Sequence, residues 1–193
     1  MTTTTQRLTL DEYLAYDDGS DRRYELVNGE LLPMSLGTGR HGAIIKRLEK
    51  IFDVEAERVQ HAWIALAGTI GLPSPRSDRW DTVRIPDVSV LTLEQWEALQ
   101  ERKAVIRLNE PPPLLVVEVV SESTKSTDYR ARRAEYSVLD IPEYWIVDPL
   151  LGKVTVCLLL EGWYEATEYQ GQTILQSSIF PELALAAETI LQG

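Results

Sequence analysis

Short apolar runs alternate along the chain with longer stretches of helical spacing. Residues 85–91, 114–121 and 144–147 are almost continuously apolar. Such runs are typical of strands that are covered on both faces. The run at 114–121 follows the stiff segment Pro111-Pro112-Pro113, and we predict that it forms a central strand.

Hairpin signals occur near both ends of the chain. Residues 23–34 contain two apolar segments separated by Asn28-Gly29. Asn-Gly is a strong hairpin signal, because both turn positions need positive φ. Residues 154–169 are divided in the same manner by Glu161-Gly162. We therefore predict an N-terminal and a C-terminal β-hairpin.

Helical signals occur between these strands. Residues 41–59 place apolar side chains on or near one face, and Thr9 with Glu12 matches a capping box for a short helix at 9–16. Further helices are expected at 93–101, at 127–139 and in part of 180–191, and another strand near 63–71.

Helices interleaved with strands and hairpins predict an α/β fold with a mixed β-sheet flanked by helices. The chain has 193 residues and contains no repeat, low-complexity tract or long linker, so we expect one domain over residues 1–193.

Composition limits the partners and the location. The formal charge of −11, from 19 basic and 30 acidic residues, argues against a broad, sequence-independent grip on DNA. A nuclease remains compatible with it, because a metal supplies positive charge locally and residues 125–133 gather basic side chains. No apolar run approaches the ~20 residues of a membrane span, and the Thr-rich start lacks the apolar region of a secretory signal. Cys157, the single cysteine, is expected in the core, and the protein in the cytoplasm.

Two carboxylates stand out because they lie in apolar strands. Asp87 opens the run at 85–91, and Glu118 lies in the middle of the run at 114–121. A buried carboxylate is costly unless its charge is compensated. Two adjacent strands with one acid each suggest a site for Mg²⁺ or Mn²⁺, which bind oxygen ligands, and hence phosphodiester hydrolysis. The alternative is that each acid caps a loop or pairs with an arginine.

A wider set of segments resembles a known family. The segments are 23–30 (RYELVNGE), His41, 85–88 (IPDV), 117–121 (VEVVS), Asp128 with Arg132 and Tyr136, and 142–149 (PEYWIVDP). In this order and spacing they resemble the Uma2 family, within the PD-(D/E)XK restriction-endonuclease-like superfamily. The resemblance covers nearly the whole chain and implies a restriction-endonuclease-like core.

The resemblance implies roles for several residues. Asp87 and Glu118 would be metal ligands, and a basic residue would orient water and offset charge at the phosphate. The superfamily's usual lysine position holds Val120 here, whereas the position used in Uma2-like proteins holds Arg132. Arginine keeps the charge but cannot be deprotonated to act as a base. Lys125 is a substitute, and the alternative for Arg132 is a solvated helix arginine.

Three more residues are candidates by the same resemblance. Glu25 matches the motif and would add a third carboxylate to the metal, whereas Glu30 across the turn is less favoured; the alternative for both is an exposed hairpin acid. His41 opens the long helix and would act as an acid–base group or a phosphate contact. Its alternative role is a structural hydrogen bond.

Two functions therefore stay open. The first is a Mg²⁺- or Mn²⁺-dependent endonuclease that acts on DNA. The second is a catalytically inactive member of the same fold that serves as a binding or assembly module and forms a homodimer. The strong negative charge and the missing lysine motivate the second function, and affinity for Mn²⁺ separates the two.

Overall fold

Two β-sheets with flanking helices form the computed structural model, which describes residues 7–20, 22–34, 37–76, 79–122 and 127–192. The strands are β1 (Tyr24–Val27), β2 (Glu30–Pro33), β3 (Trp63–Ala67), β4 (Leu72–Arg76), β5 (Arg79–Arg84), β6 (Val88–Thr92), β7 (Leu115–Val119), β8 (Glu143–Asp148), β9 (Lys153–Leu160) and β10 (Trp163–Gln170). The helices are α1 (Leu10–Ala15), α2 (Gly39–Arg58), α3 (Leu93–Glu97), the π-helix η1 (Thr127–Arg132), α4 (Arg133–Val138) and α5 (Ala187–Leu191).

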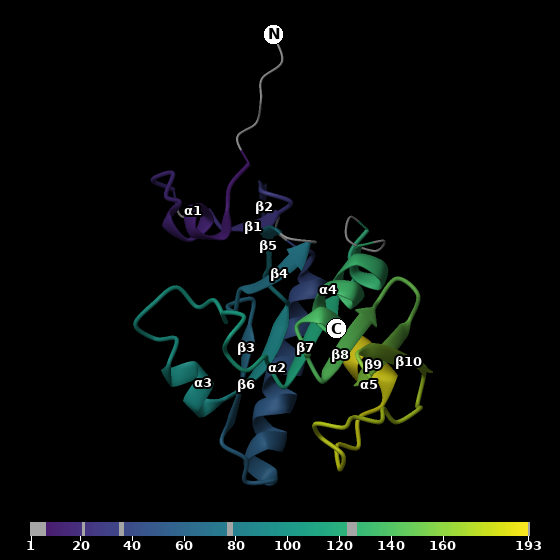
Figure 1. The fold of residues 1–193 in the computed structure, drawn as a ribbon. Coiled ribbons are helices and arrows are strands. Elements are labelled where there is room, and N and C mark those ends of the chain that lie inside the picture. Colours follow the sequence, from purple (N-terminus) through teal and green to yellow (C-terminus); the bar gives the residue numbers. More distant parts are fainter. Residues whose placement is uncertain (1–6, 21, 35–36, 77–78, 123–126, 193) are drawn as a thin grey trace.

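The two sheets differ in size and direction (Figure 1). The smaller sheet is antiparallel, in the order β2-β1-β5-β4. The larger sheet has the order β10-β9-β8-β7-β6-β3, and its β7 and β8 run parallel while the other neighbours run antiparallel. Parallel neighbours need a crossover connection, and η1 with α4 provides it. The expected mixed sheet is confirmed, with the antiparallel sheet beside it.

The larger sheet lies between two apolar layers. One layer joins α2 and α5 to the sheet and contains Phe52 in edge contact with Trp145, with the ring centroids 5.3 Å apart. The other contains Tyr136 of α4 in edge contact with Tyr144 at 5.1 Å. All five residues of β7 are buried. The prediction of a central strand covered on both faces is therefore confirmed.

Both predicted hairpins are present. Asn28 and Gly29 adopt φ of 52° and 79°, and Glu161 and Gly162 adopt 49° and 83°. These positive values at both turn positions match the right-handed twist of the flanking strands. The capping box at Thr9 is also present, because Glu12 N–H donates to the Thr9 hydroxyl and the Glu12 carboxylate accepts from Thr9 N–H.

One hairpin was not predicted. β4 and β5 pair over residues 72–84, which the apolar pattern leaves unassigned. Pro73 and Pro75 lie in β4, and proline within a run argues against a strand unless the strand lies at an edge. β4 does lie at the edge of its sheet. The strand expected at 85–91 begins only at Val88, so Asp87 precedes it.

Three helices are shorter or less regular than expected. The helix at 93–101 ends at Glu97, and the helical part of 180–191 is α5 alone. The segment at 127–139 is helical but opens as the π-helix η1. The wider π-turns are often found at functional sites.

Among the described residues no helix is both long and apolar enough to cross a membrane.

The β3 edge of the larger sheet is covered by α2. Asp53 accepts from Ala65 N–H at 2.9 Å and Glu49 accepts from Ala67 N–H at 3.3 Å. Backbone groups on a free edge would otherwise be open to pairing with another chain.

The single cysteine, Cys157, is buried in β9, and burial raises the pKa of its thiol to about 11. The expectation of a core cysteine is confirmed.

A buried glutamate fastens the C-terminal segment to β8. Glu143 accepts from Trp145 Nε1 at 2.6 Å and from the Ser177 hydroxyl at 2.7 Å. Its other oxygen accepts from Ser178 N–H and hydroxyl, both at 2.7 Å, and from Ile179 N–H at 3.1 Å. Charge-assisted bonds of this kind are stronger than neutral ones. Glu143 therefore holds the loop before α5 against the end of β8.

Glu143→Gln is expected to lower the free energy of unfolding by about 3 kcal/mol, because an amide nitrogen then faces donors that need an acceptor. Urea denaturation measures the change. The matched control is Glu165→Gln on β10, where the side chain is exposed and the expected change is within about 0.5 kcal/mol. Equal stability of the two variants would remove the structural role assigned to Glu143.

Candidate active site

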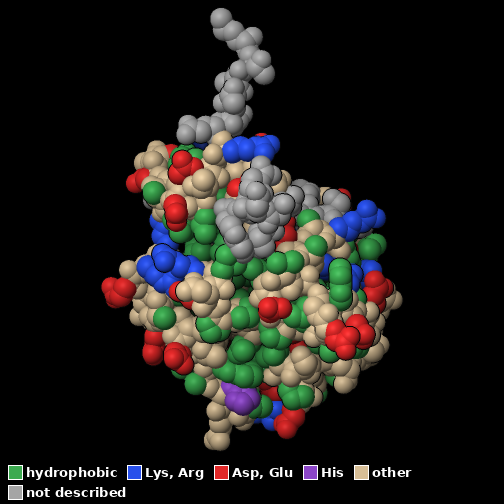
Figure 2. Space-filling model, viewed as in Figure 1, with side chains coloured by type: hydrophobic (Ala, Val, Ile, Leu, Met, Phe, Trp, Pro, Cys, Tyr) green, Lys and Arg blue, Asp and Glu red, His purple; other side chains and the backbone are tan. Residues whose placement is uncertain are grey.

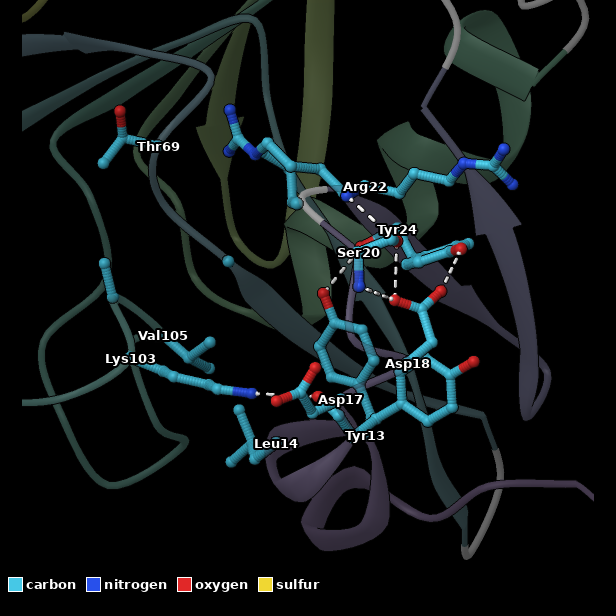
Figure 3. Close-up of a pocket in the computed structure, with 15 residues that line it drawn as sticks. Tyr13, Leu14, Asp17, Asp18, Ser20, Arg22, Tyr24, Thr69, Lys103 and Val105 are labelled. Carbon is cyan, nitrogen blue, oxygen red and sulfur yellow. Dashed lines mark hydrogen bonds between the residues drawn. The ribbon is translucent and has the colours of Figure 1, made fainter.

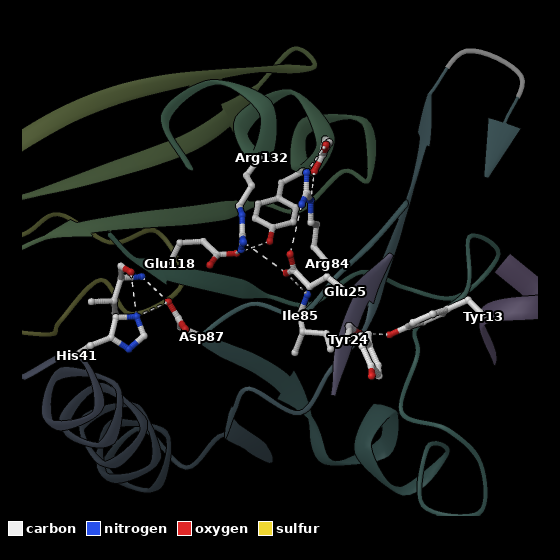
Figure 4. Close-up of polar contacts among 12 residues, drawn as sticks. Tyr13, Tyr24, Glu25, His41, Arg84, Ile85, Asp87, Glu118 and Arg132 are labelled. Atoms are coloured by element: carbon white, nitrogen blue, oxygen red, sulfur yellow. Dashed lines mark hydrogen bonds and ion pairs between the residues drawn. The ribbon is translucent and has the colours of Figure 1, made fainter. Parts of the chain in front are cut away.

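Asp87 directly precedes β6, and Glu118 lies on the neighbouring strand β7, at the same end of the larger sheet. β6 and β7 pair with Val88 opposite Val117, so Asp87 and Glu118 each lie one residue beyond the last paired position. Val119 N–H donates to Asp87 Oδ2 at 2.7 Å, which fixes the carboxylate at the strand end. In Figure 4 the Asp87 carboxylate turns toward His41 and the Glu118 carboxylate toward Arg132. The two predicted acids therefore lie at the same end of the sheet, and their carboxylates contact different partners.

His41 reaches Asp87 from the first turn of α2. The Thr38 hydroxyl caps this helix by accepting from His41 N–H at 3.2 Å. The ring Nε2 lies 3.1 Å from the Val119 carbonyl oxygen and 3.5 Å from Asp87 Oδ2. Because both neighbours are acceptors, Nε2 is the nitrogen that carries a proton in this arrangement. His41 therefore holds the Asp87 carboxylate and the end of β7 together.

Glu118 is 3% exposed and is compensated from the crossover helix. Tyr136 Oη donates to Glu118 Oε1 at 2.5 Å, and Arg132 Nη1 forms an ion pair with the same oxygen. Burial, followed by the charge of Glu118, raises the pKa of Tyr136 well above its ordinary value. The phenol thus stays a donor at neutral pH. The apolar neighbours of Glu118 on β7 cannot compensate its charge, and Arg132 of η1 and Tyr136 of α4 do so instead.

Arg132 is buried between two carboxylates. It is 6% exposed, so the alternative of a solvated helix arginine is wrong. Besides Glu118 it contacts Glu25 Oε1, with Nη2 at 3.4 Å. The π-turn of η1 ends at Arg132, which brings the guanidinium to the sheet end instead of to solvent. The basic residue that the sequence indicated is therefore present beside Glu118.

Glu25 continues the network away from Asp87. Its Oε1 accepts from Ile85 N–H at 3.0 Å, and its Oε2 contacts Arg84 Nη1 at 3.3 Å. Arg84 in turn binds Glu135 through Nε at 2.8 Å and Nη2 at 3.1 Å. Acids and arginines alternate from Glu118 to Glu135, so each buried charge touches an opposite one.

Arg84 and Glu135 were missed by the sequence analysis. Arg84 lies between the apolar residues Val83 and Ile85, and a charged residue in such a setting is a signal of the kind that identified Glu118. Glu135 lies one residue before Tyr136 in α4, and nothing in the sequence distinguishes it from a surface glutamate. Lys125 lies outside the described residues. Glu30 is exposed at the start of β2.

The donors at the sheet end suit a hard divalent cation. Asp87, with a side chain 22% exposed, offers a solvent-accessible carboxylate, and Glu118 and the Val119 carbonyl offer further oxygens beside it. Oxygen ligands of this kind are preferred by Mg²⁺ and Mn²⁺. Among the described residues no three His, Cys, Asp or Glu side chains converge as a ready metal cluster. Glu25 contacts Arg84, Arg132 and the Ile85 N–H, and Asp87 and Glu118 are the residues that could hold the cation.

The face of the molecule drawn in Figure 2 is not uniformly basic. On the face shown in Figure 2 acidic and basic side chains are interspersed, and hydrophobic side chains occupy much of the centre. A duplex-binding protein commonly gathers lysine and arginine on one face. Any attraction of a phosphate backbone on this face must therefore be local, as the charge of −11 indicates.

Comparison with known proteins identifies the family and the fold of the chain. Residues 10–188 match the profile of the Uma2 family, described as "Putative restriction endonuclease". A solved structure described as that of a "putative nuclease belonging to DUF820" from Anabaena variabilis ATCC 29413 superimposes with a TM-score of 0.75. The two chains are 17% identical, over 95% of this chain and 97% of the other, so the likeness shows the fold. No match is found among curated protein sequences. The expected restriction-endonuclease-like fold is confirmed.

Proposed function

Because the chain belongs to the Uma2 family, we propose that it is an endonuclease that hydrolyses phosphodiester bonds in DNA with Mg²⁺ or Mn²⁺. One observation carries the proposal. Asp87, just before β6, and Glu118, on the neighbouring strand β7, lie at the same end of the sheet, and Arg132 contacts Glu118. Two acids and one fixed cation are the parts that phosphodiester hydrolysis needs for charge stabilisation.

The acids would hold the metal at the sheet end. Asp87 and Glu118 would supply carboxylate oxygens to it. A divalent ion bound there would polarise the phosphate and lower the pKa of a water molecule. The hydrogen bond from Val119 N–H keeps Asp87 oriented toward that position.

The remaining residues orient and balance charge. Arg132 stabilises negative charge on the phosphate, and its guanidinium does not act as a base. Glu25 positions Arg132 through its contact at 3.4 Å, while Arg84 and the Ile85 N–H fix Glu25 itself. His41 holds its proton at Nε2 and fixes Asp87 against β7.

Cleavage of supercoiled plasmid DNA tests the proposal. Purified protein is expected to nick or linearise the plasmid with Mn²⁺ or Mg²⁺, and to leave it intact when EDTA removes the metal. Single-stranded DNA and RNA are assayed in parallel, to define the substrate. No cleavage of any of these nucleic acids with either metal would contradict the proposal.

A second candidate function is a catalytically inactive binding module of the same fold. Two observations favour it. Arg132 forms an ion pair with Glu118, which would compete with metal binding by this carboxylate, and Val120 stands at the superfamily's usual lysine position. Leu160 and Trp163, 51% and 78% exposed at the tip of the β9–β10 hairpin, suit a homodimer contact in such a module. Lack of Mn²⁺ affinity would support this candidate against the endonuclease.

A further inference from the structure

A cavity of about 340 Å³ lies beside the candidate active site. It is formed between α1 with the loop that follows it, the β3–β4 turn and the connection from α3 to β7. In Figure 3 Lys103 and Thr69 lie on one side of the opening and Tyr13 on the other. Pockets for small organic ligands commonly begin near this volume. The cavity is therefore large enough for about one nucleotide.

Aromatic rings form part of the wall. Tyr13 Oη donates to the Tyr24 carbonyl at 2.7 Å, and Tyr24 Oη donates to Asp18 Oδ2 at 2.7 Å. These bonds fix two of the rings. Tyr16 stands edge-on to Tyr24 at 5.9 Å and remains 38% exposed. An exposed ring held by a neighbour is a stacking platform for a base.

Basic side chains gather around the same cavity. Arg22, Arg23 and Lys103 line it and are exposed. The acids of the loop, Asp17 and Asp18, accept from nearby backbone N–H groups at 2.8 and 2.9 Å. Asp17 and Asp18 line the same cavity, so its three cations outnumber its two acids by one. Arg22 and Lys103 would supply the positive charge that a phosphate group requires.

The cavity is joined to the catalytic acids through the backbone. Arg23 donates to the Gly68 carbonyl, and Gly68 N–H donates to the Asp87 carbonyl at 2.9 Å. Ile85 lines the cavity, and its N–H holds Glu25 at 3.0 Å. Figure 4 shows Ile85 between Asp87 and Tyr24. A nucleotide in the cavity would thus lie on the side of Ile85 away from Glu25, near the acids proposed to hold the metal.

We propose that this cavity binds an unpaired nucleotide of the DNA strand that is cut, with its base on Tyr16 and its phosphate on Arg22 and Lys103. This inference rests on the proposed endonuclease function. A base pair inside a duplex cannot enter a cavity of this volume without unstacking, which costs a few kcal/mol. The protein is therefore expected to prefer single-stranded or locally unpaired DNA.

Binding of a fluorescent oligothymidylate, measured by anisotropy in EDTA, tests the cavity without cleavage. Wild type is expected to bind it more tightly than a blunt duplex. Tyr16→Ala and Lys103→Ala are each expected to weaken binding by about tenfold, in line with the contribution of one stacked base or one phosphate contact. Tyr16→Phe is expected to retain binding, because stacking needs the ring and not the hydroxyl.

Lys50→Ala, at an exposed lysine of α2, is the matched control and should bind as wild type. The inference is overturned if wild type does not bind the oligonucleotide, if it prefers the duplex, or if Tyr16→Ala and Lys103→Ala bind as wild type. Equal affinity for thymidine monophosphate or oligouridylate would also overturn the assignment to a DNA strand. Because EDTA excludes metal, loss of plasmid cleavage with intact oligothymidylate binding would reject the proposed endonuclease and leave the binding site in place.

Discussion

Asp87→Asn is expected to reduce DNA cleavage by about a thousandfold or more while the protein remains folded. The asparagine oxygen can still accept the hydrogen bond from Val119 N–H, which lies 2.7 Å from Asp87 Oδ2. The negative charge that would hold the metal is lost, so the chemistry fails for an electrostatic reason. Plasmid cleavage rates in Mn²⁺, together with urea denaturation, separate activity from stability.

Asp53→Asn is the matched control. Asp53 also accepts a strand N–H, that of Ala65 at 2.9 Å, but it lies on α2 at the β3 edge, outside the acid network. Its cleavage rate is expected to equal that of wild type. If Asp87→Asn cleaved DNA at the wild-type rate, Asp87 would not be a metal ligand.

Arg132→Met is expected to have two effects, because Arg132 both compensates Glu118 and would face the phosphate. Methionine fills similar space without charge, so Glu118 is left buried with only part of its compensation. Loss of one partner of a buried pair lowers the free energy of unfolding by about 3 kcal/mol. Cleavage is expected to fall by about a hundredfold or more, through lost charge stabilisation.

The two effects can be measured apart. Mn²⁺ is expected to recover part of the lost stability, because the cation replaces the guanidinium charge beside Glu118. Arg130→Met, at an exposed arginine of the same turn, should change neither stability nor cleavage. Arg132→Lys keeps a charge and should retain cleavage. Equal stability of Arg132→Met and wild type in EDTA would show that Arg132 does not compensate Glu118.

The sequence predicted the elements whose signals are local. Asn28-Gly29 specified a hairpin, because few residue pairs accept positive φ at both positions. The apolar run around Glu118 indicated a covered central strand, and an acid in such a run indicated a compensated charge. These signals require no knowledge of the rest of the chain. They were sufficient to place Glu118 on a covered strand, whereas Asp87 lies just before the strand that was expected to contain it.

Contacts between distant segments could not be predicted in the same way. Arg132 reaches Glu118 because η1 and α4 cross over between the parallel strands β7 and β8, and Arg132 lies at the end of η1, where α4 begins. Arg84 binds Glu135, which is 51 positions away in the chain. Arg84 lies in β5, and the strands β4 and β5 were not predicted because β4 contains two prolines. Local patterns identify charged residues, whereas their pairing depends on topology. The cavity beside the site likewise depends on how α1 is placed over the β3–β4 turn.

Calorimetric titration of Mn²⁺ into wild type and into the Asp87→Ala/Glu118→Ala double variant tests the central claim most directly. The claim is that these two carboxylates hold the catalytic metal. We expect wild type to bind Mn²⁺ and the folded double variant to show no binding heat, with plasmid nicking lost in parallel. Equal Mn²⁺ binding by the two proteins, or no binding by wild type, would contradict the account.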